Sequence, residues 1–474
     1  MTYRVFGLFL LAALCMPVPA AADGHRAADR SLSMALTGDA IISRRMSVLK
    51  HKPFLDMIEL IRGADAAFTN IEILFHDYES FPMHRSGGTY MRADPIMARE
   101  LAWAGFNLGS LANNHTGDFG VPAMNLTIRY AQEAGIVVAG AGASLAQARE
   151  ARFLDTAGGR VALISVASTF PDHSRASRSY DDNMLPRPGL SPLRRKRTYV
   201  ITAEQADVLR QIAADLGLTL SGGGGRRYDV LGHKFTIGEE MRLFGRQFLV
   251  GAEPDTISEP DPQDMAELEA VVSNAARLAN YVLVSIHGHQ RNKDLTIPAD
   301  FLITFSRAMI DAGADVVVGH GPHVLRGIEI YKDRPIFHGL GNFIFQNDTV
   351  LRLAQENYDR YGLGPNEFVA DYFDTMYDND RRGRPLDPMI WESVVAITNF
   401  DGDALSSIEL HPVSLGFGQP RPDRGTPQMA DAQTSRKIIA DLCRLSEPFG
   451  TRVSFKDGIG TVDLEPLRGE ADCD

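Results

Sequence analysis

One segment of the chain reads Val316-Val-Val-Gly-His-Gly-Pro-His-Val-Leu-Arg-Gly327. Its apolar start predicts a buried strand, and His320 and His323 follow where that strand ends. Glycine and proline between the two histidines allow a tight turn, which would direct both imidazoles at one metal ion. Two ordinary core histidines are the alternative. The segment therefore predicts a metal site at the carboxyl edge of a sheet.

Polar side chains follow other apolar runs in the same manner. Asp39 ends one run, and Asn70 and Glu72 end the next, where alternation places both on one side of the strand. Asn114 and His115 follow a third run, so an amide oxygen lies beside an imidazole able to bind metal or transfer a proton. A turn or helix cap is the alternative at Asp39, as is a cap beside a buried histidine at Asn114. Donors of this kind suit a divalent cation.

Two further segments carry histidines and glycines. His287-Gly288-His289 ends an apolar strand and can supply another nitrogen ligand. In His338-Gly339-Leu340-Gly341-Asn342-Phe343 the glycines would let the backbone approach the site or a substrate closely. Since the chain has only 13 histidines, their concentration at the ends of apolar runs favours a metal-centred catalytic site.

The order of apolar patterns predicts alternating strands and helices. Strands are predicted at 34–37, 66–70, 107–111, 136–139, 161–165, 281–286, 316–319, 327–331 and 335–339. Helices are predicted at 95–104, 121–134, 262–280 and 298–312, the first capped by Asp94. Alternating βα units imply an α/β fold with a largely parallel, covered sheet. Asp401-Gly402 predicts a hairpin between strands at 393–400 and 405–412.

Two irregular segments interrupt this rhythm. Residues 171–246 are rich in Pro, Arg, Ser and Gly, with a helical stretch near 203–216, and are predicted to form an insertion or lid. Within them, Arg194-Arg195-Lys196-Arg197 is predicted to be a solvated surface loop. Residues 349–388 form a second predicted insertion. We expect one main domain at 31–425, followed by a C-terminal tail at 426–474.

The two ends of the chain indicate export. Residues 1–22 combine a short apolar run with Ala20-Ala21-Ala22, which is typical of a cleaved secretory signal peptide; an uncleaved anchor is the alternative. After cleavage only Cys443 and Cys473 remain, and an oxidising compartment would permit one disulfide between them. We therefore expect a periplasmic or cell-envelope protein.

The formal net charge of −12 limits the partners. Nucleic acids and anionic membranes are bound by clustered cations, so neither is expected as a partner, and membrane contact is expected only through an uncleaved signal segment. An anionic substrate would need local cations. The candidates besides metal ions are Arg85, Arg92, Arg326 and the Arg194–Arg197 run.

Two motifs together resemble those of the capsule-biosynthesis CapA family, the poly-γ-glutamate synthesis proteins. They are Gly-His-Gly-Pro-His-Val-Leu-Arg-Gly at 319–327 and Gly-Leu-Gly-Asn-Phe-Ile-Phe at 339–345. The resemblance runs from about residue 36 to 345 and continues more loosely through 391–393 and 409–425. It implies a fold similar to the calcineurin-like metallophosphatases, a layered sandwich of mixed, largely parallel sheets flanked by helices, with insertions.

The resemblance also implies roles for individual residues. It implies a centre of one or two divalent ions, Mn, Fe or Zn, with the ligands Asp39, Glu72, Asn114, His287, His320 and His323. It implies His115 as the general acid. Residues expected to contact the substrate or support the ligands are Asn70, Asn113, His289, Arg326, His338 and Asn342.

The chain departs from the phosphatase pattern at Ile41 and at Glu72, where the phosphatases have an aspartate and the capsule proteins a glutamate, and from the capsule-protein pattern at Gln290. The first motif of the phosphatases has a histidine two residues after the aspartate, where this chain has Ile41, so one metal site would lack a ligand. A family carboxylate is also missing at Gln290, and His289 is the candidate to replace it. These departures put phosphatase activity in doubt.

Three functions remain open. The first is an exported CapA-like protein that hydrolyses or transfers poly-γ-glutamate or a similar anionic surface polymer, in a complex with an envelope polymer synthase. The second is a periplasmic metallophosphoesterase that acts on a phosphorylated small substrate. The third is a non-catalytic subunit that binds the polymer or serves as a scaffold.

Overall fold

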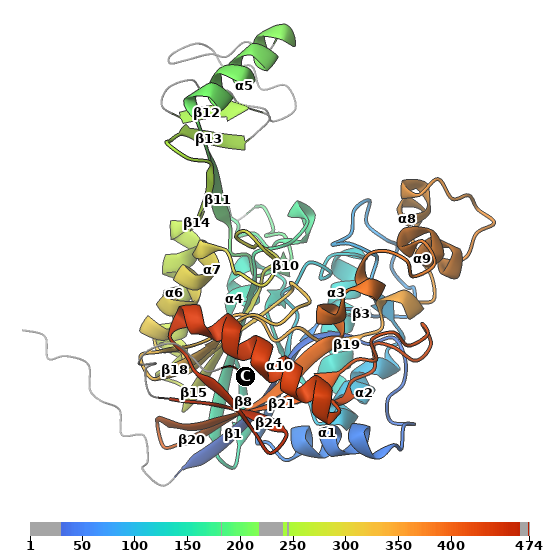
Figure 1. The fold of residues 1–474 in the computed structure, drawn as a ribbon, viewed down its shortest axis with the longest axis vertical. Helices are drawn as coiled ribbons and strands as arrows, with labels where there is room; N and C mark the ends of the chain where they lie inside the picture. Colours follow the sequence, from blue (N-terminus) through green and yellow to red (C-terminus); the bar gives the residue numbers. More distant parts are fainter. Residues whose placement is uncertain (1–29, 182, 218–239, 244–245, 465–472, 474) are drawn as a thin grey trace, which may run out of the picture.

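The computed structural model describes residues 30–181, 183–217, 240–243, 246–464 and 473 (Figure 1). The predicted signal peptide at 1–22 lies outside the described residues. Within the described part, no helix is both long and apolar enough to span a membrane.

The larger sheet has a parallel centre with antiparallel strands on one side. Its main strand order is β23-β24-β21-β20-β1-β2-β5-β6, and β19 and β22 pair with β1 and β21. The parallel strands are β1 (Ser31–Ile41), β2 (Ala66–Ile71), β5 (Leu108–Ser110), β6 (Val137–Ala139) and β19 (Asn342–Phe345). The antiparallel strands are β20 (Glu392–Asp401), β21 (Ala404–Ser414), β22 (Gln428–Met429), β23 (Val453–Lys456) and β24 (Ile459–Val462).

The smaller sheet is built in the same way and has the order β17-β18-β16-β15-β9-β8. Its parallel centre consists of β9 (Gly159–Ala167), β15 (Tyr281–His287), β16 (Val316–His320) and β18 (Arg334–Phe337). The antiparallel strands β8 (Arg152–Thr156) and β17 (Ile328–Tyr331) close its two edges. Each prediction of a strand in this region, from 161–165 to 335–339, is confirmed within a few residues.

The two sheets pack face to face, with helices on their outer sides. Along β9, Val161 and Leu163 belong to the core between the sheets, whereas Ile164 and Val166 belong to the core under the outer helices. The larger sheet is covered by α1 (Lys52–Arg62), α2 (Ile96–Ala104) and α3 (Gly120–Glu133). The smaller sheet is covered by α6 (Pro262–Ala275) and α7 (Asp300–Asp311). The predicted layered α/β sandwich is thereby confirmed.

Local signals set some helix ends as predicted. The Asp94 side chain accepts a hydrogen bond of 2.9 Å from the backbone N–H of Ile96 at the start of α2. Gly105 ends the same helix with a left-handed φ of 112°. By contrast, α6 ends at Ala275, five residues before the predicted end at 280, and a turn leads into β15.

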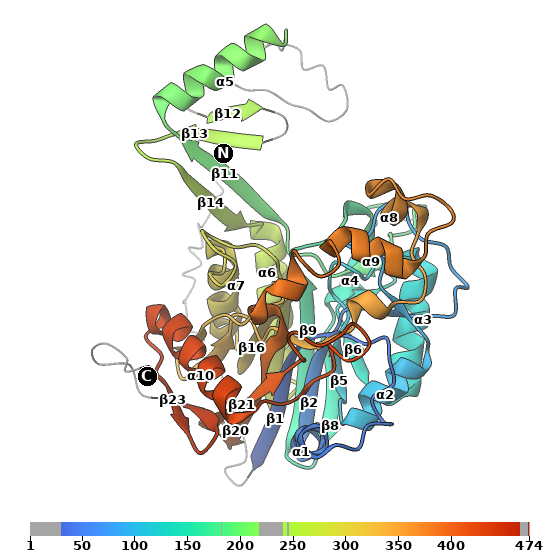
Figure 2. The ribbon, with the colours of Figure 1, turned by 45° about the vertical axis from the view of Figure 1, so that its right-hand side comes forward.

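The first insertion forms an arm that projects from the body (Figures 1 and 2). It contains β11 (Arg195–Ile201), α5 (Ala203–Asp215), β12 (Glu240–Leu243), β13 (Arg246–Val250) and β14 (Asp255–Pro260). The prediction that Arg194–Arg197 is a loop is wrong from Arg195 onward, because β11 pairs with both β13 and β14. That pairing also carries the arm to Pro260, beyond the predicted end at 246.

The second insertion lies on the same side of the molecule as the arm and carries two helices (Figure 2). They are α8 (Gln355–Arg360) and α9 (Val369–Tyr377), followed by the short helix η3 (Arg384–Leu386). The remaining short elements are β3 (Leu74–Phe75), β4 (Arg92–Ala93), β7 (Ala141–Gly142), α4 (Leu145–Arg149), η1 (Asp172–Ser174), β10 (Gly189–Leu190), η2 (Asn347–Thr349), η4 (Pro388–Trp391) and η5 (Glu447–Phe449).

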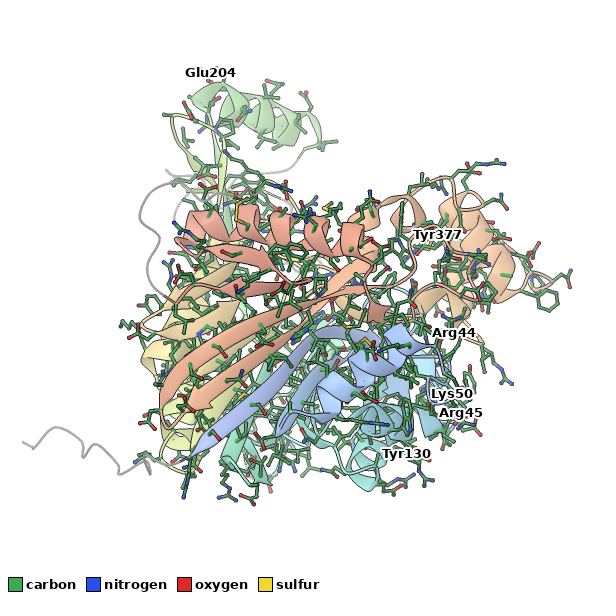
Figure 3. All side chains as sticks on the ribbon, turned by 60° about the horizontal axis from the view of Figure 1, so that its bottom comes forward. Arg44, Arg45, Lys50, Tyr130, Glu204 and Tyr377 are labelled. Carbon is green, nitrogen blue, oxygen red and sulfur yellow. A yellow bond between two sulfur atoms is a disulfide. The ribbon has the colours of Figure 1, made fainter. Side chains whose placement is uncertain are left out.

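The predicted C-terminal tail at 426–474 contains structured elements of the main body. Strands β22, β23 and β24 extend the larger sheet, in which β20 lies beside β1 and β21 lies beside β20 (Figure 3). Helix α10 (Ala432–Ser446) packs against β21 and β23. Cys443 of this helix forms a disulfide with Cys473, with the two Cα atoms 5.6 Å apart.

Candidate metal centre

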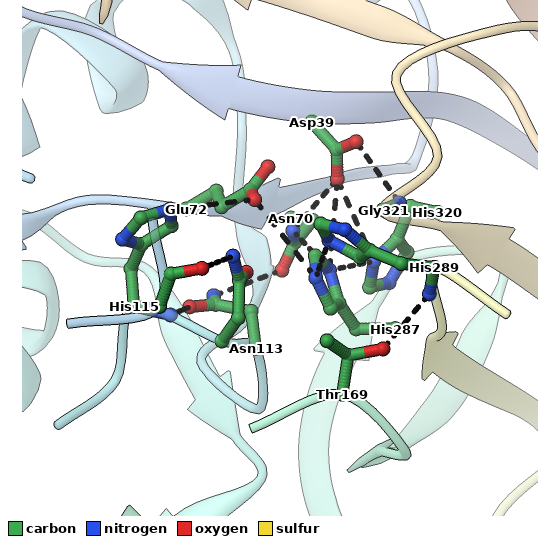
Figure 4. A network of polar contacts seen from close by, with 12 residues as sticks. Asp39, Asn70, Glu72, Asn113, His115, Thr169, His287, His289, His320 and Gly321 are labelled. Carbon is green, nitrogen blue, oxygen red and sulfur yellow. Dashed lines mark hydrogen bonds and ion pairs between the residues drawn. The ribbon is translucent and has the colours of Figure 1, made fainter. Parts of the chain in front are cut away.

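The carboxyl ends of the two parallel sheet centres meet at one point. In the larger sheet, Asp39 of β1 is in register with Asn70 of β2 and with Asn342 of β19. In the smaller sheet, His287 of β15 is in register with His320 of β16. Because parallel strands end at the same edge, pairing aligns these side chains within each sheet, and the face-to-face packing of the two sheets brings both sets together (Figure 4).

Six side chains form two adjacent groups that could each hold a metal ion. The groups are Asp39, His287 and His320, and Glu72, His289 and His323; in each, the donor atoms lie within 4.8 Å of one another. His287 faces both groups, because its Nδ1 is 3.8 Å from Oδ1 of Asp39 and its Nε2 is 3.9 Å from Oε1 of Glu72. His289, expected from the sequence to contact the substrate, to support the ligands or to replace the missing family carboxylate, thus lies among the candidate ligands.

Neighbouring groups fix the orientation of two imidazoles. Ser285 Oγ is 2.6 Å from Nε2 of His320, so the other ring nitrogen, Nδ1, faces Asp39 at 3.7 Å. Nδ1 of His323 donates to Oδ1 of Asn342 at 2.8 Å, which leaves Nε2 facing Glu72 at 3.9 Å. Such hydrogen bonds select the tautomer that presents a lone pair to an ion.

The electrostatics of the cluster favour ligation. Burial lowers the pKa of each of the four imidazoles, and that of His320 to about 4. They are therefore neutral near pH 7, which is the form that binds metals. Burial and the nearby Asp39 carboxylate raise the pKa of Glu72. Burial also raises the pKa of Asp39, but its contacts with His323 and the other imidazoles outweigh this effect and lower the pKa below its usual value.

The donor set fits one or two divalent ions. Both carboxylate oxygens of Glu72 are buried and have no hydrogen-bond partner among the described residues. A buried charge without a partner is strongly unfavourable, so a cation at this point would satisfy it. The donor atoms of His287 and His320 lie 3.1 Å apart, and those of His287 and His289 lie 3.0 Å apart. Ligands about 2.1 Å from one ion have spacings of about 3 to 3.5 Å.

The turn after β16 brings the backbone against the cluster. Gly321 has a φ of 109°, and its N–H donates to Oδ2 of Asp39 at 3.0 Å. A Cβ at this position would lie 2.9 Å from the His289 ring and 3.1 Å from the His287 ring. Glycine is therefore required both by its conformation and by the space.

A chain of amides connects the two ends of the cluster. Asn70 Nδ2 donates to Oδ1 of Asp39 at 2.8 Å, and Asn113 Nδ2 donates to Oδ1 of Asn70 at 3.2 Å. The Asn113 oxygen accepts a 3.0 Å hydrogen bond from the backbone N–H of His115. Asn113 thus supports both Asn70 and His115. Asn114 donates to the Gly87 carbonyl at 3.2 Å, and its buried oxygen has no partner among the described residues.

His115 lies beside Glu72 and is held by an aspartate that the sequence analysis missed. Its Nε2 is 3.9 Å from Oε1 of Glu72, and its Nδ1 is 2.7 Å from Oδ2 of Asp118. Asp118 is itself fixed by the N–H groups of Gly87 and Met91, at 2.8 and 2.9 Å. An acidic residue three positions after the histidine was the available signal.

Arg384 of η3 is a second residue near the cluster that the sequence did not single out. Its guanidinium carbon lies 5.3 Å from the Phe345 ring centre, and that ring lies 5.4 Å from the ring of His323. The positive charge of Arg384 acts on Glu72, His289 and His323. No motif in the sequence distinguishes it from Arg381 and Arg382 beside it.

Two predicted site residues contact other parts of the protein. Arg326 donates to the carbonyls of Gln290 and Leu295, both at 3.0 Å, so it supports the loop that follows His289. His338 lies 3.2 Å from Oε2 of Glu329 and stacks on Phe449 at 4.4 Å. It is therefore part of a separate buried contact.

Ile41 and Gln290, where the chain departs from the phosphatase and the capsule-protein pattern, have an apolar and a structural role. Ile41 is buried in the core under the outer helices of the larger sheet and supplies no ligand. Gln290 accepts from Ser168 Oγ at 2.6 Å and donates to Thr169 Oγ1 at 2.9 Å, which ties the loop to the end of β9.

Two other arginines were predicted as cations for an anionic substrate. Arg92 is buried, donates to the His76 carbonyl and pairs with Asp77. Arg85 is exposed.

Comparison with known proteins gives the family. A model described as "Bacterial capsule synthesis protein PGA_cap" matches residues 33–347. "Uncharacterized protein y4sH" of Sinorhizobium fredii is 36% identical over 444 residues, which are 91% of this chain and 93% of that protein. "Capsule biosynthesis protein CapA" of Bacillus anthracis is 22% identical over 328 residues, 68% of this chain and 61% of that protein. "PGA biosynthesis protein CapA" of Bacillus subtilis is 41% identical over 108 residues, 22% of this chain and 28% of that protein. The chain therefore belongs to the bacterial capsule synthesis family PGA_cap.

Proposed function

We propose that this protein is an exported, metal-dependent hydrolase or transferase that acts on an anionic surface polymer of the poly-γ-glutamate type. The observation that carries the proposal is the pair of adjacent carboxylate–imidazole groups beside the His115–Asp118 hydrogen bond. A purely structural cluster would not leave the Glu72 carboxylate buried without a hydrogen-bond partner among the described residues.

The ligands we assign follow from the two groups. Asp39, His287 and His320 would hold one ion, and Glu72, His289 and His323 the other. Asn114, whose buried oxygen has no hydrogen-bond partner among the described residues, stays a candidate ligand. Mixed carboxylate and imidazole donors suit Mn, Fe or Zn. When bound, such an ion supplies Lewis acidity that polarises a carbonyl or phosphoryl oxygen and favours ionisation of water.

His115 is the proton donor in this proposal. Nδ1 donates to the Asp118 carboxylate at 2.7 Å, which fixes the orientation of the ring and directs Nε2 toward Glu72. A proton on Nε2 would then be placed to pass to a leaving nitrogen or oxygen. The polar chain from Asn113 keeps the backbone of His115 in place.

The family membership favours a polymer as the substrate. Relatives in Bacillus carry the names "Capsule biosynthesis protein CapA" and "PGA biosynthesis protein CapA". An envelope polymer synthase would supply the chain. A periplasmic metallophosphoesterase is the second candidate, because the two neighbouring ion groups would also suit phosphoester hydrolysis.

Export is part of the proposal. The Cys443–Cys473 disulfide is compatible with an oxidising compartment, and the sequence at 1–22 has the features of a signal peptide. Together they favour the periplasm or the outer cell envelope.

The experiment is metal analysis by mass spectrometry of the purified mature protein, reloaded with Mn, Fe or Zn. We compare the wild type with His320→Ala/His323→Ala and with the matched control His51→Ala/His84→Ala, which removes two exposed histidines. We expect one or two ions in the wild type and the control, and loss in the first variant. The loaded protein is then tested on poly-γ-glutamate and on an aryl phosphoester. No metal in any protein would overturn the enzymatic proposal and leave a binding or scaffold role.

A further inference from the structure

A large groove lies at the base of the arm. It has a volume of about 840 Å³, and its lining includes His289, one of the candidate metal ligands. Arg195, Arg197 and Tyr199 of β11 line the arm side, and the loop with Arg291 and Lys293 lines the body side. Figure 2 shows β11 and β14 rising from the body as the stalk of the arm. The groove thus joins the arm to a candidate metal ligand.

The cations of the groove are not neutralised by ion pairs. Within the described part of the chain, no ion pair is present for Arg195, Arg197, Arg291 or Lys293. The Nε atoms of Arg195 and Arg197 are buried and have no hydrogen-bond partner there. Burial, together with the positive charges of Arg197 and Arg246, lowers the pKa of Arg195 to about 10. Unpaired, partly desolvated guanidinium groups attract anions strongly.

The positive charge of the groove contrasts with the net negative charge of the chain. The chain has a formal charge of −12, yet four cations and only two carboxylates, Asp255 and Asp300, line the groove. Just outside it, Arg194 is paired with Asp264 at 2.9 Å. Positive charge is therefore concentrated along the wall that leads to the metal centre.

We propose that this groove binds the extended polycarboxylate chain of the substrate and leads one of its linkages to the side of the metal centre that carries His289. This inference rests on the proposed function, and it assigns the groove as the surface on which the polymer lies. Arg195 and Arg197 are two residues apart on one strand, so their side chains share a face at a spacing of about 7 Å. With Arg291 and Lys293 opposite, they form an array that suits carboxylates repeated along a chain.

The dimensions favour a chain over a small phosphate ester. A single phosphate would contact one or two of these cations and leave most of an 840 Å³ groove empty. The Phe301 ring lies 5.7 Å from the Arg195 guanidinium, and Tyr199 accepts from Arg197 at 3.1 Å. These contacts orient the two guanidinium groups on the wall, so the array is formed before a substrate arrives.

The test is binding of fluorescein-labelled poly-γ-glutamate oligomers to the full mature protein, measured by anisotropy at low salt. In Arg195→Gln/Arg197→Gln we expect affinity to fall about tenfold or more and its salt dependence to weaken, with metal content unchanged. Arg291→Gln/Lys293→Gln changes exposed residues of the opposite wall and should weaken binding if the arm variant fails to fold. The matched control Arg99→Gln/Arg277→Gln removes two exposed charges elsewhere and should bind like the wild type.

The outcomes separate the groove from the proposed function. Wild-type affinity in both groove variants would overturn the proposal that the groove binds the polymer, but the polymer could still be the substrate. An equal loss in the control would also overturn it, since net charge alone would then explain binding. A wild-type protein that binds no polymer would overturn the proposed polymer substrate itself.

Discussion

The Nδ1 atom of His115 and the Oδ2 atom of Asp118 lie 2.7 Å apart, and both side chains are buried. Two backbone N–H groups hold the Asp118 carboxylate, so the aspartate fixes the direction of the imidazole ring. The free edge of that ring faces Glu72 of the candidate metal centre at 3.9 Å. Asp118 is therefore a positioning residue that acts through His115.

We expect Asp118→Asn to lower kcat for polymer cleavage about 10- to 100-fold with little change in KM, because the ring loses its orienting carboxylate. His115→Gln should lower kcat by about 100-fold or more. The measurement is steady-state kinetics of the metal-loaded variants, with new amino termini as the readout.

A double variant distinguishes positioning from general damage. If Asp118 acts through His115, the combined variant should be no slower than His115→Gln alone, since the two effects then coincide. Additive losses would contradict the assignment. Metal content equal to that of the wild type in all three proteins is the control for an intact centre.

Much of the fold could be predicted because each central strand is a short apolar run. Two examples are the strands Val316–His320 and Tyr281–His287. Both are buried on both faces, so their sequences are mostly apolar, and each ends in a histidine. The arm was harder to predict. Its strand β11 begins Arg-Lys-Arg, and only pairing with β13 and β14, distant in sequence, makes it a strand.

The candidate site was predictable where ligands follow strands directly. Asp39, Glu72, His287 and His320 all meet in the structure, because pairing aligns the strand ends. Residues placed by loops were less predictable. Asp118 lies three residues after His115, and that spacing was its only signal in the sequence. Arg384 lies on η3 of the second insertion, and no motif marks it. His338 also follows a strand, yet its contacts with Glu329 and Phe449 lie outside the cluster.

Replacement of Glu72 should affect the stability of the metal-free protein and that of the metal-loaded protein in opposite ways. In metal-free protein, Glu72→Gln removes a buried carboxylate that has no hydrogen-bond partner in the described structure, so stability should stay the same or rise. In metal-loaded protein the same change removes a ligand and should lower both ion content and stability. Thermal unfolding of both forms tests this. A loss of stability in the metal-free form as well would contradict the assignment of Glu72 as an unsatisfied ligand.

Gly321→Ala should damage the centre while leaving most of the fold intact. The new Cβ would lie 2.9 Å from the His289 ring at a φ of 109°, so we expect a loss of about 1–3 kcal/mol in the free energy of unfolding. Metal affinity should fall as well, because His287 and His289 must move. Gly402→Ala is the matched control, since Gly402 has a φ of 60° and open space around it. Metal affinity lost equally in the control would argue against a local clash.

Asp264 anchors the arm, and its contribution to stability should depend on pH. The carboxyl of α6 accepts from Arg149 and, at 2.9 Å, from the side chain of Arg194, which directly precedes β11. Burial raises the pKa of Asp264, but the hydrogen bonds from Arg194 and Arg149 outweigh this and lower it below the ordinary 3.8. The folded state therefore favours the ionised form.

Because the folded pKa lies below the unfolded one, this stabilisation is complete above the unfolded pKa and is lost as pH falls through the folded pKa. We expect Asp264→Asn to cost about 3 kcal/mol near neutral pH, since it removes the buried carboxylate that pairs with the buried Arg149 and the partly exposed Arg194. The difference from the wild type should be constant above about pH 5 and shrink below about pH 4. Urea unfolding across this range measures it. Asp311→Asn, which breaks the exposed pair with Lys332, is the control and should change the stability far less than Asp264→Asn. A difference that persists unchanged at pH 3 would show that the charge of Asp264 does not stabilise the base of the arm.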